Sequence, residues 1–327
     1  MNTDTGTLYL HPDRNLGMEL VRATEAAAIR AVPFIGMGDK NAADGAAVDA
    51  MRTFLGTVNF DGVVVIGEGE KDAAPMLYNG EHVGNGRGPA CDIAVDPIDG
   101  TSLTAAGRQN ALSMIAVADR GSMYDPSAVF YMEKIVTGHE GHGVVDLRQP
   151  IGENLRALAK AKNKPVSDMV VAVLDRPRHA QLIAEIRQAG AGTRLMLDGD
   201  VAGGINAAMY GTRIDMCVGT GGTPEGIITA CALKALGGFI QGRLLPKDDD
   251  ERQRAIDAGH DVDRVLGVND LVTSDNTYFV ATGVTDGQLV DGVRRAGPVI
   301  HTESIVLRGR SGTIRRVVAD HVAEKWL

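Results

Sequence analysis

Apolar residues recur at helical spacing in two segments near the start of the chain. Between Leu16 and Ile29 they return about every three to four residues, which is the period of one buried helix face. A second helical pattern begins near Asn41, and Asp44 shares its apolar face with Ala47, Val48, Met51 and Leu55. An unpaired carboxylate is costly on an apolar face, so Asp44 is a candidate for chemistry rather than packing.

Short apolar runs bounded by glycine or proline predict strands. Three of them, at 63–66, 93–95 and 112–118, lie in the first half of the chain, and acidic residues follow the first two. From 169 to 236, strand-like and helix-like segments alternate, which is typical of a parallel or mixed α/β layer. A further strand is expected at 278–282, and a basic stretch at 308–316 follows it.

These patterns predict the α/β fold class, with two α/β halves packed together. Residues 1–160 are the expected N-terminal half, which carries most of the acidic strand ends, and residues 161–327 are the C-terminal half. The boundary is placed between 150 and 165, where Pro150 and Pro165 interrupt the pattern.

The composition excludes several classes of protein. Apolar residues make up 44% of the 327 positions and charged residues 23%, as in an ordinary folded protein. The net charge of -9 argues against nucleic acid as a partner. No apolar run approaches the ~20 residues that cross a bilayer, and the N-terminus lacks a signal-peptide pattern. Because the three cysteines show no paired spacing, we expect a cytoplasmic protein without membrane partners.

The segment from Cys91 to Thr101 carries the most informative acidic pair. An apolar strand leads to Asp96, Pro97 is expected to end the strand, and the Asp99-Gly-Thr turn can open a helix whose first N–H groups point outward. Ligands of open α/β sheets bind at this edge. Two carboxylates beside free N–H donors suit hard cations bridged to a phosphate, although an ordinary turn and helix cap would use the same residues.

A second acidic strand end lies earlier in the chain. Glu68 is flanked by glycines directly after the run 63–66, and Glu70 follows it. With Asp44 and Asp96, these carboxylates would repel one another unless cations lay between them. The eight histidines are scattered, so oxygen ligands and Mg²⁺ or Mn²⁺ fit better than zinc.

The second half adds three candidate segments. Glu225 follows Gly222-Thr-Pro at the expected start of a helix, where the helix dipole favours an anion. Asp198-Gly-Asp200 follows an apolar run, and Arg176-Pro-Arg178 supplies two guanidinium groups suited to phosphate oxygens. Taken singly, a helix start or a solvated surface would also explain each of them.

The chain lacks several familiar motifs of phosphate binding and nucleophilic catalysis. It contains no G-x-x-x-x-G-K-[ST], no G-x-S-x-G and no H-E-x-x-H, and no cysteine has an arginine six residues on. The run 195–202 has the D-x-D rhythm of haloacid-dehalogenase phosphatases, which would make Asp198 a covalent nucleophile. Ala202, however, stands where threonine or valine is usual in that motif.

Longer blocks of sequence carry a resemblance to a known family. Asp96-Pro-Ile-Asp-Gly-Thr101 resembles the motif of the lithium-sensitive, metal-dependent sugar and inositol phosphatases. Further blocks, collinear over about 13–316, are similar to the bacterial class II fructose-1,6-bisphosphatases; they are 38–48, 65–72, 74–81, 175–179 and 221–226.

The resemblance implies an αβαβα sandwich and hydrolysis of the 1-phosphate of fructose 1,6-bisphosphate, a step of gluconeogenesis, by water activated at two or more Mn²⁺ or Mg²⁺ ions. Position by position, it implies the metal ligands Asp44, Glu68, Asp96, Asp99 and Glu225. It implies catalytic roles for Thr101, Asp99 and Glu70, with Thr101 orienting the attacking water. The implied substrate contacts are Asp99, Gly100, Thr101, Tyr131, Arg176, Pro177, Arg178, Asp198, Gly199, Asp200 and Gly222. A homotetramer or homodimer is implied as well.

Two positions depart from the family pattern, and two wider interpretations stay open. Asp99 is glutamate in some relatives, and Met37 stands where an arginine is expected. The substrate range could extend to sedoheptulose 1,7-bisphosphate or to another sugar or inositol phosphate. A non-catalytic phosphosugar-binding regulator is the non-enzyme alternative, but every expected acidic position and Thr101 are filled, which favours an enzyme.

Overall fold

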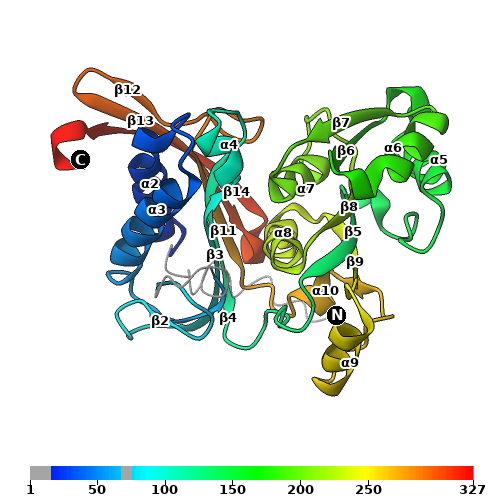
Figure 1. The fold of residues 1–327 in the computed structure, drawn as a ribbon, viewed down its shortest axis with the longest axis horizontal. Helices are drawn as coiled ribbons and strands as arrows, with labels where there is room; N and C mark the ends of the chain where they lie inside the picture. The colour runs from blue at the N-terminus through cyan, green and yellow to red at the C-terminus, as the bar shows by residue number, and fades with distance from the viewer. Residues whose placement is uncertain (1–15, 68–75, 327) are drawn as a thin grey trace.

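The chain folds into five alternating layers of helices and sheets (Figure 1). The structure is a computed structural model, and it describes residues 16–67 and 76–326. The helix layers are, in order across the molecule, α2 (Leu16–Ala31) with α3 (Lys40–Leu55), α7 (Asp200–Ala208) with α8 (Thr223–Leu236), and α5 (Ile151–Ala161) with α6 (Ala180–Gln188). The predicted α/β class and the implied αβαβα sandwich are therefore confirmed.

The first sheet lies between the α2–α3 layer and the central helices. Its strand order is β12-β13-β11-β4-β3-β1-β2, and β14 pairs with β13. Strands β1 and β3 are parallel, and the other neighbouring strands of this sheet that the structure describes are antiparallel. The strands are β1 (Asp61–Ile66), β2 (His82–Val83), β3 (Ala90–Asp99), β4 (Leu112–Asp119), β11 (Tyr278–Gly283), β12 (Arg294–Ala296), β13 (Val299–Arg308) and β14 (Thr313–Val322).

The second sheet lies between the central helices and the α5–α6 layer. Its order is β10-β9-β5-β8-β6-β7, and β6 runs parallel to both β7 and β8. The strands are β5 (Tyr131–Thr137), β6 (Val170–Leu174), β7 (Gly192–Met196), β8 (Met216–Gly222), β9 (Phe239–Leu244) and β10 (Leu266–Gly267). The shorter helices are α4 (Thr101–Ala105), α9 (Asp249–Asp257) and α10 (Val268–Leu271).

Among the described residues, three large groups of buried apolar side chains hold the layers together, and a small fourth group joins α2 to β13. The central group joins Met114 of the first sheet to Ile227 of α8 and Met132 of the second sheet. The outer groups pack the other face of each sheet against its helix pair. Because both faces of the first sheet are covered at β4, this strand is almost continuously apolar and lacks the alternation of a half-exposed strand. The strands β7 and β14, in contrast, are largely exposed.

The strands do not divide between the sheets at the boundary placed near 150–165. Strand β5 precedes that boundary but belongs to the second sheet, whereas β11 to β14 follow it and complete the first sheet. The basic stretch at 308–316 spans the end of β13, a short 3-10 turn and the start of β14. Arg310, Arg315 and Arg316 are exposed, whereas Arg308 is buried and donates to the Thr277 carbonyl.

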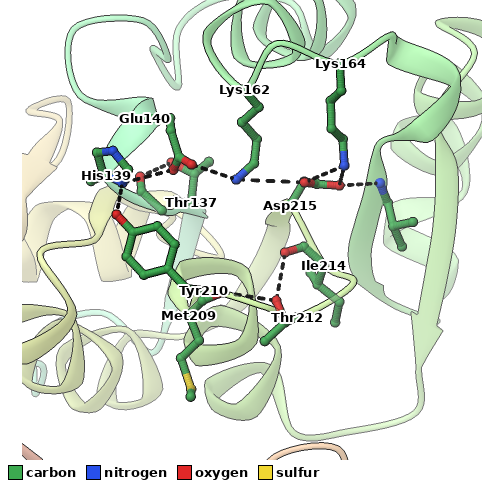
Figure 2. A network of polar contacts seen from close by, with 12 residues as sticks. Thr137, His139, Glu140, Lys162, Lys164, Met209, Tyr210, Thr212, Ile214 and Asp215 are labelled. Carbon is green, nitrogen blue, oxygen red and sulfur yellow. Dashed lines mark hydrogen bonds and ion pairs between the residues drawn. The ribbon is translucent and has the colours of Figure 1, made fainter. Parts of the chain in front are cut away.

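An ionic cluster fixes the end of the second sheet that is remote from the acidic strand ends (Figure 2). Lys164 Nζ lies 2.8 Å from both carboxylate oxygens of Asp215, and Lys162 Nζ lies 3.8 Å from Asp215 and 3.2 Å from Glu140. Asp215 also accepts from the Val170 N–H at 2.9 Å, at the start of β6. Among the residues described, no helix is long and apolar enough to span a membrane.

Candidate active site

Parallel pairing brings the carboxyl ends of β1 and β3 side by side. Ile66 pairs with Ala94, so Gly67, which follows β1, and Asp96, near the end of β3, lie at the same edge of the sheet. Gly67 is required there, because a Cβ at this position would lie 1.9 Å from the Leu77 carbonyl oxygen. Glu68 and Glu70 continue the chain from Gly67 but lie outside the described residues.

The end of β3 differs from the prediction that Pro97 would terminate the strand. The strand continues to Asp99, and its register with β4 shifts between Asp96 and Asp99. Proline has no N–H to donate, and a local irregularity in the ladder is where a strand tolerates it. The expected turn into a helix is confirmed: Gly100 has φ +89°, a conformation that suits glycine, and α4 begins at Thr101.

Asp99 is buried and lies close to three other acidic side chains. Its side chain is 6% exposed, and burial together with Asp198, Asp200 and Glu225 raises its pKa well above the usual value. Atom Oδ2 of Asp99 is buried and makes no hydrogen bond within the described part of the chain. Such an atom is the kind of ligand position that a hard cation would satisfy.

Lys134 is a functional candidate that the sequence analysis missed. It comes from the middle of β5, is 7% exposed, and places Nζ 2.7 Å from Asp200 Oδ2. Burial alone lowers the pKa of Lys134, but Asp200 and Glu225 outweigh burial, and the pKa lies above its usual value. A lysine between the apolar residues Met132 and Ile135 of a strand was the available signal.

The start of α8 agrees with the prediction. Strand β8 extends to Gly222, Pro224 lies in the first helical turn, and Glu225 follows it. A Cβ at Gly222 would lie 1.7 Å from Glu225 Oε2, so a larger residue there would displace this carboxylate from its position. Asp96 and Glu225 line one cavity of about 250 Å³, together with Gly67, Asn79 and Glu251.

Several implied substrate residues come together beside this carboxylate group. Tyr131 pairs directly with Gly222 across β5 and β8. The guanidinium carbon of Arg178 lies 5.4 Å from the centre of the Tyr131 ring, and Arg178 also donates to the Thr220 carbonyl at 2.9 and 3.2 Å. Arg176 and Pro177 lie in the same loop, and Asp198, Gly199 and Asp200 enter from the turn into α7.

His179 anchors the loop that carries Arg176 and Arg178, called the arginine loop below. It was not singled out from the sequence. Its Nδ1 lies 2.8 Å from the Leu174 carbonyl oxygen, and Nε2 lies 2.8 Å from the Thr220 nitrogen. Since the backbone N–H must donate to Nε2, the geometry assigns the ring proton to Nδ1. Burial lowers the pKa of His179, and the nearby Arg178 and Arg176 act in the same direction.

For the other predicted residues, the structure gives the position on the fold and the burial. Asp44 is half-buried on α3, which packs against β3 and α4, and Thr101 is half-buried at the first position of α4. Within residues 16–67 and 76–326, no three His, Cys, Asp or Glu side chains are arranged to hold a metal ion. Met37, in place of the expected arginine, is 70% exposed.

Comparison with known proteins shows one consistent family. Residues 14–321 match the family described as bacterial fructose-1,6-bisphosphatase, glpX-encoded, whose members generally depend on a metal. Fructose-1,6-bisphosphatase 1 class 2 of Escherichia coli K12 is 45% identical over 325 residues, covering 95% of this chain and 96% of that protein. The class 2 enzymes of Escherichia coli O6:H1 and Shigella flexneri give the same figures: 45% over 325 residues, with 95% and 96% coverage. The chain therefore belongs to the bacterial class II fructose-1,6-bisphosphatase family.

Proposed function

We propose that the chain hydrolyses the 1-phosphate of fructose 1,6-bisphosphate by direct attack of water, giving fructose 6-phosphate and inorganic phosphate. The observation that carries this proposal is the buried Asp99, whose unsatisfied Oδ2 faces a site with three further carboxylates. No covalent nucleophile is needed for such chemistry, and Asp198 acts as a substrate contact instead. Family membership across 14–321 supports the same reaction.

We assign the cation ligands to Asp44, Glu68, Asp96, Asp99 and Glu225, and a catalytic role to Glu70. The donor set fits Mg²⁺ or Mn²⁺ because it consists of carboxylate oxygens. When bound, two or more such ions lower the pKa of a water and neutralise charge on the phosphoryl oxygens. Without cations, the buried carboxylates would be unfavourable, which is the physical reason for the raised pKa of Asp99.

The chain's own groups supply orientation. Thr101 has a hydroxyl group at the edge where β3 turns into α4, so it is suited to orient the attacking water. Arg176 and Arg178 bind phosphate oxygens, and Tyr131, Gly222 and the 198–200 turn contact the sugar. Asp99 and Gly100 fix the position of Thr101, because the left-handed backbone of Gly100 sets the direction of the turn.

The test is phosphate release from fructose 1,6-bisphosphate after removal of metal with EDTA, with and without added Mg²⁺ or Mn²⁺. We expect release only when metal is restored. Asp96→Asn should lower kcat at least a hundredfold, whereas Asp49→Asn, an exposed carboxylate on the same α3 helix as Asp44, should leave it unchanged. Full activity in EDTA, or wild-type activity of Asp96→Asn, would contradict the proposal.

The same assay decides the substrate range. Sedoheptulose 1,7-bisphosphate differs by one carbon beyond the reacting end, and such a difference is worth only about 1 to 3 kcal/mol in a pocket. We expect fructose 1,6-bisphosphate to have the higher kcat/KM. A higher value for the seven-carbon substrate would reassign the main substrate without changing the reaction class.

We also propose that the enzyme is a cytoplasmic homotetramer or homodimer. Strand β14 pairs with β13 alone among the described strands, and Val318 at its middle is 74% exposed. Antiparallel pairing of two copies about Val318 would oppose Arg316 to Asp320 and Ile314 to Val322. Light scattering should show an oligomer that Val318→Lys dissociates by at least one step; a wild-type monomer would contradict the proposal.

A further inference from the structure

A second cavity, of about 310 Å³, is lined by residues of α4, the edge strand β7 and α7. Figure 1 shows α4 beside the first sheet and β7 in the second sheet. Three segments that are distant in sequence line it: the turn after α4, the chain from β7 into α7, and the loop after β11. Its volume is sufficient for a small organic molecule rather than for a single ion. Of the implied metal ligands that the structure describes, none lines this cavity, whereas the implied substrate contacts Asp198 and Gly199 do.

The lining of this cavity is cationic. Arg108 lines it from the turn after α4, Arg194 from β7 and Asp198 from the turn into α7, so the lining carries two positive charges and one negative charge. Both arginines are exposed at the mouth of the cavity. Within the described part of the chain, neither guanidinium group has a hydrogen-bond or ion-pair partner. The amide side chains of Asn206 and Gln288 add neutral donors and acceptors, and Asn206 is only 5% exposed. Such a lining suits an anion with a polar body.

The wall of the cavity is held in a specific conformation. Asn110 has φ +77°, which is uncommon outside glycine. Its N–H donates to the Asp286 carbonyl at 2.9 Å, and its Oδ1 accepts from the Gln288 N–H at 3.2 Å. Strained backbone that neighbouring groups hold in place is a feature of binding sites.

The same wall meets the candidate active site at Gly199. The position of a Cβ on Gly199 lies 3.6 Å from the Asn110 carbonyl oxygen and 3.8 Å from Asp99 Oδ2. Gly199 itself has φ +82° and stands between Asp198 and Asp200. A ligand that moves Asn110 or Asp198 therefore acts on groups that also face the substrate.

We propose that this cavity is a second small-molecule site for a phosphate monoester with a hydroxyl-bearing body. Arg108 and Arg194 bind the phosphate dianion, and the amides of Asn206 and Gln288 bind the hydroxyl groups. Occupancy changes the affinity of the substrate site through Gly199, and by linkage the substrate changes the affinity of this site. The inference goes beyond the proposed function, and its binding test does not depend on catalysis.

The test uses saturation-transfer NMR on the full chain with Mg²⁺, glycerol 3-phosphate as the probe, and saturating fructose 6-phosphate to fill the substrate site. We expect the probe to bind wild type, and the Arg108→Ala/Arg194→Ala variant to bind it at least tenfold more weakly. Arg213→Ala is the matched control, because Arg213 is exposed, lacks a partner among described residues and lies outside the cavity lining. Equal binding by the double variant would overturn the proposal.

Single-arginine variants and the KM for fructose 1,6-bisphosphate provide two further tests of this site. If the double variant loses its circular dichroism spectrum, Arg108→Gln and Arg194→Gln are measured singly, and each should weaken the probe several-fold. In wild type, the probe should change the KM for fructose 1,6-bisphosphate, and this change should vanish in the arginine variants. Complete displacement of the probe by fructose 6-phosphate would overturn the proposal, because the cavity would then be an extension of the substrate site.

Discussion

Lys134 Nζ lies 2.7 Å from Asp200 Oδ2, and it also donates to the Gly222 carbonyl at 3.0 Å. Both side chains are largely buried. This lysine thereby joins β5 to the turn into α7 and to the end of β8. It is the cation that lowers the pKa of Asp99 against burial and the neighbouring carboxylates.

Lys134→Met should therefore destabilise the protein. Breaking a buried ion pair leaves an uncompensated charge and costs about 3 to 5 kcal/mol. We expect urea unfolding to show a loss of that size, and kcat/KM to fall more than tenfold. Lys160→Met, which changes an exposed lysine on α5, is the control and should shift neither quantity. Unchanged stability of Lys134→Met would mean that solvent already screens the pair.

Asp99→Asn should stabilise the metal-free protein while abolishing activity. Burial and three neighbouring carboxylates raise the pKa of Asp99, so its ionised form opposes folding at pH values above its unfolded pKa. The wild-type protein in EDTA should lose stability as pH rises through the folded pKa, and the asparagine variant should lose less. We expect a gain of about 1 to 3 kcal/mol in EDTA at pH 8.

Thermal unfolding with and without Mg²⁺ checks this prediction. Added Mg²⁺ should raise the melting temperature of wild type more than that of Asp99→Asn. The variant has a neutral amide in place of the charged carboxylate, so it binds the cation less tightly. A lower melting temperature for the variant in EDTA would show that the Asp99 carboxylate is satisfied without a cation.

We expect the arginine loop to lose order at acidic pH, because His179 anchors it only when the imidazole is neutral. Burial lowers the folded pKa of His179 below its unfolded value near 6.5, so the folded state binds fewer protons. Stability is then retained above the unfolded pKa and falls as pH drops through the folded pKa. Protonated Nε2 cannot accept from the Thr220 N–H, and KM for the substrate should rise over the same range.

Stability and KM profiles between pH 8 and pH 5 test this. His179→Gln should give a flatter profile than wild type, and His82→Gln, at an exposed histidine, should reproduce the wild-type curve. An identical slope for wild type and His179→Gln would place the titrating group elsewhere.

Asp215→Asn should affect stability without affecting catalysis. Asp215 is 6% exposed and accepts from Lys164 and Val170 (Figure 2). It precedes the first residue of β8, whereas Gly222 of the candidate site is the last residue of that strand. Loss of its charge leaves Lys164 without its ion-pair partner, whereas Lys162 keeps Glu140. We expect about 2 kcal/mol of destabilisation by urea unfolding. KM and kcat at 25 °C should equal the wild-type values; a changed KM would indicate that this end of β8 controls the site.

Local sequence predicted the acidic strand ends and the helix starts because neighbouring residues build them. Gly100 and Thr101 define a turn, and Pro224 with Glu225 defines a helix start, whatever surrounds them. The prediction failed at Pro97, where pairing with β4 carries the strand past a residue that ends most strands. Glu68 and Glu70 remain predictions.

The sequence by itself determined the α/β class and the candidate chemistry, since hydrophobic period, glycine turns and carboxylate spacing are local properties. Only the tertiary structure decided that Lys134 faces Asp200, that His179 holds the arginine loop, and that Arg108 and Arg194 share one cavity. These contacts join segments from different strands and both sheets. Their energies depend on burial and on distances across the fold, which no local pattern contains.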